Sequence, residues 1–321
     1  MRKNVNTEHI EGRIYQHSLA VKEVKNQASA NFGKPYINGV IEVAVDEKAM
    51  NVIPVEFTFV TENTKNGGKN KTYTELMKII NEGKSLITDG FEAATKVSID
   101  TSLGLNDFVA QDETMVSQKV NQGGFVTIVS TLKDESSRSS FKTDMLITNV
   151  TRVEADAERF IESDYVVVRG AVFNFKNDLL PVEFVVHNPE GMKYFENLDA
   201  TSSEPVYTQV WGKISFTTKK DSQKVESAFG EAAVDVRERK VREWIITGAS
   251  KVPYDFGDEN VMTLEELTKA SQDRQVYLAE IKKRRDDYMA QKNAATPASG
   301  FATPTAAPTP TNTVATGGFN F

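Results

Sequence analysis

The chain has 321 residues, 39% of them hydrophobic and 26% charged, which is enough to bury the cores of about two domains plus appendages. It contains no cysteine, which excludes disulfide frameworks, thiol catalysis and thiolate metal sites. A net charge of -7 argues against the uniformly basic surface of a duplex-DNA binder, although a local basic groove is compatible with it.

The N-terminal segment MRKNVNTEHI lacks the apolar stretch of a signal peptide. No run in the chain approaches the ~18 apolar residues that a membrane-spanning helix needs. We therefore expect a cytoplasmic protein with no membrane partner.

Three pairs of similar segments occur in the same order along the chain. They are GRIY and GAVF at 12–15 and 170–173, PVEF at 54–57 and 181–184, and the segments 144–156 and 243–255. An ordered set of this kind predicts two homologous units that arose by duplication and differ in the lengths of their connections.

Alternating apolar residues predict that both units are rich in β-strands. We expect one face of each PVEF strand to pack inside its unit: Val55, Phe57 and Phe59 in the first, Val182, Phe184 and Val186 in the second. Further strands are predicted at 11–21, 36–45, 94–102, 123–132 and 144–153 in the first unit, and at 165–175, 206–216 and 242–252 in the second.

A helix-compatible stretch follows the third strand of each unit, at 71–83 and 190–198. Three strands, a helix and two strands is the order of an OB fold, a five-stranded Greek-key barrel. The predicted fold is therefore mostly β, with two tandem OB-like five-stranded barrels at 1–157 and 158–257; small sandwiches are the alternative. Gly170 precedes Pro181 by only 11 positions, whereas Gly12 precedes Pro54 by 42, so a strand of the second barrel is lost or supplied from elsewhere.

The C-terminal part of the sequence changes in character. Thr263 and Glu266 form a capping box, and apolar residues at partly helical spacing predict a helix within 258–293. Its basic run at 282–285 is interpreted as a solvated face, with phosphate contact as the alternative. Residues 294–321 are rich in Ala, Thr and Pro and uncharged, which predicts a disordered tail.

The first unit resembles a known group of proteins. The stretches GRIYQHSLAVKEVKN and GKPYINGVIEVAVDEKAMNVIPVEFTFVTE are similar to the N-terminal region of bacteriophage proteins associated with OB-type single-stranded-DNA binding. The resemblance covers mainly residues 8–155 and carries no catalytic or metal-binding motif. It implies a role in protecting single strands during replication or recombination in the cytoplasm of a host cell.

The tail also resembles that of bacterial and phage single-strand-binding proteins, in which a flexible linker ends in a short docking peptide. Phe319 and Phe321 are the aromatic residues of the tip, GGFNF. The tip lacks the acidic residues that such peptides usually carry. The resemblance implies that Phe319 and Phe321 bind replication or recombination proteins.

Binding of single strands without sequence reading needs cations for the phosphates and aromatic faces for the bases. Both occur together in two glycine-containing segments of the first unit and in one strand of the second. The predicted nucleic-acid-binding residues are Lys25, Lys34, Tyr36, Lys69, Lys71, Tyr73, Trp211, Lys213, Lys219 and Lys220. The alternative interpretation is solvated lysines and packed aromatic side chains.

Signatures of enzymes are missing from the sequence. The segment GGKNKT has Asn70 where a phosphate-binding loop requires Ser or Thr after the lysine. The three histidines lack metal-ligand spacing. We expect no enzymatic activity, metal or cofactor. The two open hypotheses are a phage single-stranded-DNA-binding protein, and a structural or adaptor phage protein that uses its barrels and tail for protein contacts.

Overall fold

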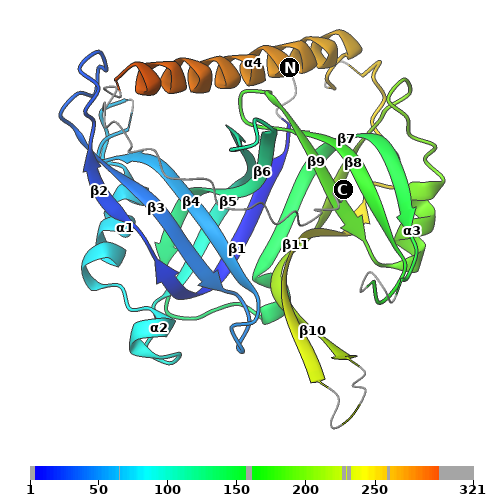
Figure 1. The fold of residues 1–321 in the computed structure, drawn as a ribbon, viewed down its shortest axis with the longest axis horizontal. Coiled ribbons are helices and arrows are strands. Elements are labelled where there is room, and N and C mark those ends of the chain that lie inside the picture. Colours follow the sequence, from blue (N-terminus) through cyan, green and yellow to red (C-terminus); the bar gives the residue numbers. More distant parts are fainter. Residues whose placement is uncertain are drawn as a thin grey trace, which may run out of the picture.

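A computed structural model describes residues 4–64, 66–156, 161–225, 229, 233–258 and 261–295. Strands dominate these residues, and a long C-terminal helix lies across one end of the molecule (Figure 1). The predicted mostly-β class is confirmed.

Ring one is a closed barrel formed by five strands of the N-terminal half. Its strands are β1 (Asn6–His17), β3 (Pro35–Ala44), β4 (Val52–Thr61), β5 (Lys96–Val109) and β6 (Met115–Ile128). β1 pairs antiparallel with both β3 and β5, and β4 pairs parallel with β6, which closes the ring. This is the pairing of an OB barrel, with α1 (Lys71–Glu82) between the third and fourth strands.

Ring two repeats this order of pairing. Its strands are β7 (Ser139–Val153), β8 (Tyr165–Phe173), β9 (Leu179–Val186), β10 (Val206–Val225) and β11 (Ala233–Ala249). β7 pairs with β8 and β10, β9 pairs parallel with β11, and α3 (Pro189–Glu196) follows the third strand. Two OB-like rings therefore replace the alternative of small sandwiches.

The remaining elements are short. A four-residue strand, β2 (Ala20–Glu23), extends ring one at the edge of β3. α2 (Leu86–Asp89) and a 3-10 turn, η1 (Glu135–Ser137), precede β5 and β7. β1 also pairs with β7, so the strands of the two rings belong to one continuous sheet.

The pairing corrects two sequence-based assignments. The sequence patterns place residues 139–157 in the first unit, but β7 is the first strand of ring two. β7 is therefore the strand that the second unit was predicted to lack. The segments 144–156 and 243–255 are consequently the first and last strands of one ring, not equivalent strands of two. Only the PVEF segments occupy equivalent places, in β4 and β9, each paired parallel with the last strand of its ring. The duplication itself stays a prediction.

Gly12 and Gly170 also lie in non-equivalent strands, the first of ring one and the second of ring two. Both nevertheless allow the first two strands of a ring to approach closely. A Cβ on Gly12 would lie 2.1 Å from the carbonyl oxygen of Ala44, and one on Gly170 would lie 1.9 Å from that of Leu146. The glycine of each segment therefore meets the same steric requirement.

The core runs through both rings, and the inner faces of the PVEF strands contribute to it as predicted. Val55 and Phe57 in β4 are buried, as are Val182, Phe184 and Val186 in β9. Phe59 is the exception, because its side chain is 48% exposed. The alternating pattern of β4 therefore continues past the point where the strand stops facing the barrel interior.

α4 (Leu264–Ala295) begins with the predicted capping box, in which the Thr263 and Glu266 side chains accept from each other's backbone N–H groups. Leu267 packs in a small core cluster with residues of ring two. Arg274 donates to both carboxylate oxygens of Asp107 in β5, at 2.7 and 2.5 Å. The helix thus ties the two rings together (Figure 1).

Candidate nucleic-acid interface

An aromatic pair lies on the outer surface of ring one, on its second and third strands. The rings of Tyr36 in β3 and Phe59 in β4 are 4.6 Å apart between centroids, and Tyr36 is half-buried. Tyr36 pairs with Thr61, two residues beyond Phe59, so both side chains belong to the same face. The face of strands two and three is the one that OB folds use for oligonucleotides.

Lysines surround this pair on the neighbouring strand and connection. Lys22 of β2 pairs with Tyr36 and donates from Nζ to Asn38 Oδ1 at 2.8 Å. Lys34 and Lys25 are exposed, and Lys34 Nζ donates to Asn31 Oδ1 at 3.2 Å. Phe32, in the same connection, is 51% exposed. This part of the chain therefore presents aromatic faces and cations together. We call Lys22, Phe32, Lys34, Tyr36 and Phe59 the aromatic patch.

The connection from β4 to α1 continues from the end of the same strand pair. Lys69 and Lys71 are exposed there, and Asn70 caps α1 by accepting from the Thr72 N–H at 3.1 Å. The Tyr73 side chain is half-buried and packs against the core, and its role in binding stays a prediction. Lys69 and Lys71 extend the positive charge beside Thr61.

A second, smaller group lies on ring two. Trp211 and Lys213 in β10 are exposed on either side of the buried Gly212, and Trp211 is 39% exposed. Trp211 pairs with the exposed Lys142 of β7, a cation that sequence reasoning missed because its partner strand was not known. The Trp211 indole lies against Gly248, where an added Cβ would be 2.4 Å from Nε1. This packing fixes one face of the indole.

β10 and β11 extend beyond ring two as a projecting hairpin (Figure 1). Lys219 and Lys220 belong to β10 in this hairpin, but their side chains lie outside the described residues. Near the base of the hairpin, Asn51 of ring one forms a bridge with Thr217 and accepts from the Phe216 N–H at 2.8 Å. The hairpin between β3 and β4 thus contacts β10.

The predicted residues form two groups rather than one surface. The predicted residues between Lys25 and Tyr73 belong to ring one, and Trp211 and Lys213 both lie on the fourth strand of ring two, beside its first strand. Sequence reasoning also missed Phe59, which its alternating pattern placed in the core. The sequence offered no signal for this, because the register that places Phe59 near Tyr36 is set by the pairing of β3 with β4.

The second and third strands of ring two carry paired charges, and the Tyr165 ring at the start of β8 lies 5.6 Å from the ring of His187, which follows β9. Arg169 and Glu183 are cross-strand neighbours, with 3.3 Å between Nε and Oε2. Arg152 of β7 binds Asp164 at 2.8 Å and Glu196 at 3.1 Å. Because these charges already have partners, this face is less suited to phosphates than the aromatic patch.

Buried polar contacts hold the two rings against each other. Trp244 of β11 donates from Nε1 to Glu8 of β1 at 2.8 Å, and Thr101 donates to the other carboxylate oxygen at 2.8 Å. Burial outweighs these hydrogen bonds and raises the pKa of Glu8 to about 7. Lys119 of β6 lies 4.7 Å above the Trp244 ring and donates to the Glu183 carbonyl at 2.6 Å. Burial lowers the pKa of Lys119 to about 8.

Phe319 and Phe321, predicted to bind a partner, lie outside the described residues, as does almost all of the predicted tail. Within the described part of the chain, no helix is long and apolar enough to cross a bilayer. The same residues include no group of three or more His, Asp or Glu side chains that could hold a metal ion.

Comparison with known proteins places the chain in a family. The YorF family model matches residues 5–284, which include both rings and most of α4. The chain belongs to the YorF family. No curated protein matches its sequence.

Two solved structures are similar to this YorF chain at low sequence identity. A deletion mutant of the single-stranded DNA binding protein from Thermus aquaticus has 11% identity and a TM-score of 0.45, over 81% of this chain and all of the other. A Replication Protein A heterotrimer bound to ssDNA has 9% identity and a TM-score of 0.20, over 83% of this chain and 69% of the other.

Proposed function

We propose that this YorF chain binds single-stranded DNA without sequence preference, mainly through the aromatic patch of ring one. The observation that carries the proposal is the contact between the half-buried Tyr36 ring and the exposed Phe59 ring on the second and third strands of an OB-like ring. Stacking on such rings tolerates any base, because every base has a π-face. Lys22 and Lys34 lie beside the pair, where they can meet phosphates.

The net charge of -7 is compatible with this function because the cations are local. Lys25, Lys34, Lys69 and Lys71 are exposed around the end of the β3–β4 pair, where they raise the local positive potential. Trp211, Lys213 and Lys142 form a second contact region on ring two in this proposal. We assign the larger share of affinity to ring one, because the corresponding face of ring two carries paired charges.

A fluorescence titration with labelled oligothymidine and with a duplex of equal length, each at two salt concentrations, tests the proposal. We expect preference for the single strand and an affinity that falls with salt at a log-log slope of about -0.7 per neutralised phosphate. Absence of binding at low salt, or preference for the duplex, would contradict single-strand binding.

Removing either ring of the aromatic pair should weaken binding without unfolding the protein. We expect Tyr36→Ala or Phe59→Ala to cost ~1 to 3 kcal/mol in oligothymidine affinity, the usual contribution of one base stack. Lys34→Ala should mainly reduce the salt slope, because it removes a charge rather than a stacking surface. Affinities equal to wild type in all three variants would place the groove elsewhere.

We further propose bacteriophage replication or recombination as the setting, and the host cytoplasm as the location. Support comes from the resemblance of residues 8–155 to phage proteins associated with single-strand binding. In this setting Phe319 and Phe321 would bind a replication or recombination protein. Deleting GGFNF should then remove capture of that protein while oligonucleotide affinity stays unchanged.

A further inference from the structure

A run of five paired strands joins the two groups of predicted binding residues. Because β1 pairs with β7, the strands β6, β5, β1, β7 and β10 lie side by side across both rings. One residue of each strand is directly opposed to one of the next, in the order Phe125, Asp100, His9, Ser140 and Lys213. Opposed residues share a face of the sheet, so these side chains form one row that crosses the ring junction over four strand spacings, roughly 19 Å.

The row lies on the outer face of both rings. Ile10, Val126 and Phe141, each next in sequence to a residue of the row, are buried in the core. Phe125, by contrast, is 72% exposed, and Lys213 is also exposed. The outer face of the junction is therefore open to a ligand.

Lys142 and Trp211 lie beside the row on the same face. Lys142 follows Ser140 by two positions in β7. It pairs with Thr7 of β1 on one side and with Trp211 of β10 on the other. A hollow of about 360 Å³ lies at this point, lined in part by Thr7, Ser140 and Lys142. An exposed aromatic ring thus lies at each end of the face, Phe125 on ring one and Trp211 on ring two.

We call Phe125, His9, Lys142, Trp211 and Lys213 the junction surface. Its two lysines are exposed, and neither ammonium group makes an ion pair or hydrogen bond with another described residue. Glu243 of β11, beyond the row, lies close to Lys119 and to His187, whose Nε2 is 3.7 Å from the carboxylate. Lys142 and Lys213 are therefore available to phosphates.

The two carboxylates of the outer face already have partners. His9 lies between Asp100 and Glu11, 3.1 Å from a carboxylate oxygen of each. Lys133 donates from its backbone N–H to Glu11 at 2.6 Å, and its ammonium group lies 3.6 Å from the same carboxylate. Three ammonium groups thus stand against two carboxylates, which leaves this face with a net positive charge.

The junction surface also reaches the lysines that precede α1. Thr72, in the first turn of α1, donates from Oγ1 to the carbonyl oxygen of Gly124 at 3.0 Å. Phe125 therefore lies beside the start of α1, where Lys71 is exposed. The connection from β4 to α1 begins at the end of the strand that carries the aromatic patch. Lys71 and Phe125 thus connect the aromatic patch with the junction surface.

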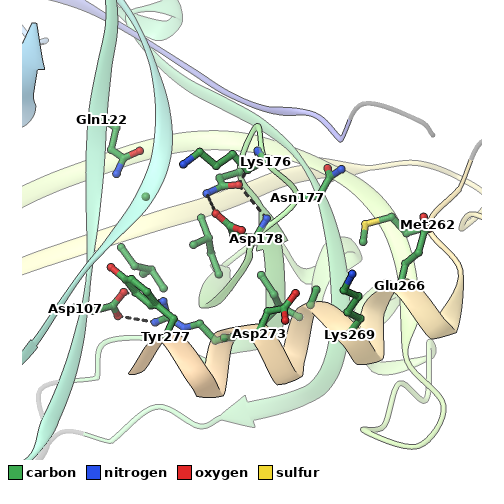
Figure 2. Close-up of a pocket in the computed structure, with 17 residues that line it drawn as sticks. Asp107, Gln122, Lys176, Asn177, Asp178, Met262, Glu266, Lys269, Asp273 and Tyr277 are labelled. Carbon is green, nitrogen blue, oxygen red and sulfur yellow. Dashed lines mark hydrogen bonds and ion pairs between the residues drawn. The ribbon is translucent and has the colours of Figure 1, made fainter. Parts of the chain in front are cut away.

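The cavity beneath α4 is less suited to a strand that crosses between the rings (Figure 2). It has a volume of about 630 Å³, and four carboxylates and three cations line it: Asp107, Asp178, Glu266, Asp273, Lys176, Lys269 and Arg274. Its net negative charge repels phosphates. The charges therefore favour the outer face of the junction.

We infer that one DNA strand crosses from ring one to ring two over the junction surface, with bases stacked on Phe125 and Trp211 and phosphates near Lys142 and Lys213. The inference rests on the proposed function and names the route by which a single strand contacts both rings. Phe125 is then a binding residue of ring one in addition to the aromatic patch.

Fluorescence titration of the full chain with two labelled oligothymidines tests this route. A strand of about 8 nucleotides fits one OB fold, whereas a strand of about 30 nucleotides can contact both rings. We expect Phe125→Ala to raise the Kd of the longer strand about tenfold, as the loss of one base stack does, and to leave the Kd of the shorter strand unchanged. Lys142→Gln should raise the Kd of the longer strand and reduce its log-log salt slope by about 0.7.

Phe175→Ala and Lys84→Gln are the matched controls, because they remove an exposed aromatic ring and an exposed lysine outside the junction surface. Both controls should bind the two strands with the wild-type Kd. Phe125→Ala should have the same Tm as Phe175→Ala, because both side chains are largely exposed.

Wild-type affinity of Phe125→Ala and Lys142→Gln for the longer strand would overturn the route and leave the proposed function intact. An equal loss for both strand lengths would also overturn it, because Phe125 would then belong to the site of ring one alone. If the wild-type chain binds neither strand, the proposed function fails and the route fails with it.

Discussion

Replacing Phe57 by Ala should lower the free energy of unfolding by roughly 3 to 5 kcal/mol. The side chain is 1% exposed and lies against Gly123 of β6, where an added Cβ would be 2.4 Å from the Phe57 ring. Truncation would remove the favourable free energy of burying the ring. It would also leave a cavity where β4 pairs with β6 to close the barrel. Phe184→Ala in ring two should cost a similar amount, because its ring is also 1% exposed and packs 5.1 Å from Phe141.

Phe59→Ala is the matched control for this prediction. It removes the same side chain two residues further along β4, from a position that is 48% exposed. Urea denaturation followed by circular dichroism should therefore show a much smaller loss of stability for Phe59→Ala than for Phe57→Ala. Oligothymidine affinity should show the reverse order, with a larger loss for Phe59→Ala than for Phe57→Ala. Equal destabilisation by both variants would mean that Phe59 is a core residue and that the aromatic patch lacks its centre.

Much of the fold could be predicted from periodicity alone. The β4 and β9 strands alternate apolar and polar residues, so their buried faces follow from the pleat. The helices α1 and α3 follow from helix-compatible stretches after the third strands. These features depend on neighbours in the sequence. A strand pattern separates the two faces of a strand, but Phe59 shows that it does not report where along the strand burial ends.

The partners of a strand depend on distant residues, and this explains the misplaced boundary. β7 pairs with β1, β8 and β10, so nothing in its own sequence indicates which ring it completes. The same limit applies to the site. Tyr36 was identified by composition, but its partner Phe59 becomes visible only when β3 and β4 are in register, and Lys142 only when β7 lies beside Trp211.

The buried contact between Glu8 and Trp244 predicts a specific dependence of stability on pH. In the folded chain burial raises the pKa of Glu8 from its ordinary value of 4.5 to about 7. Between these values the folded state binds more protons than the unfolded state, so the free energy of unfolding falls as pH rises. The stability contributed by the protonated carboxyl is present below about pH 4.5 and is lost through pH 7, by roughly 3 kcal/mol in total.

Glu8→Gln should remove this dependence while keeping the contacts. The amide oxygen can accept from Trp244 Nε1, and the amide nitrogen can donate to Thr101 Oγ1. Relative to wild type, the variant should therefore become more stable as pH rises from 4.5 to 8. Lys119 has the opposite effect at higher pH. Because burial lowers its pKa to about 8, the free energy of unfolding rises between pH 8 and its ordinary pKa of 10.5.

Chemical denaturation of wild type and Glu8→Gln at half-unit steps from pH 4.5 to 8 measures the difference directly. Glu82→Gln is the control, since it removes one carboxylate from an exposed position on α1. Across this range the free energy of unfolding of Glu8→Gln should rise relative to wild type by roughly 3 kcal/mol. The difference between Glu82→Gln and wild type should stay constant with pH. A Glu8→Gln curve parallel to wild type would show that the carboxylate stays ionised between the rings. The hydrogen bonds from Trp244 and Thr101 would then outweigh the cost of burying its charge.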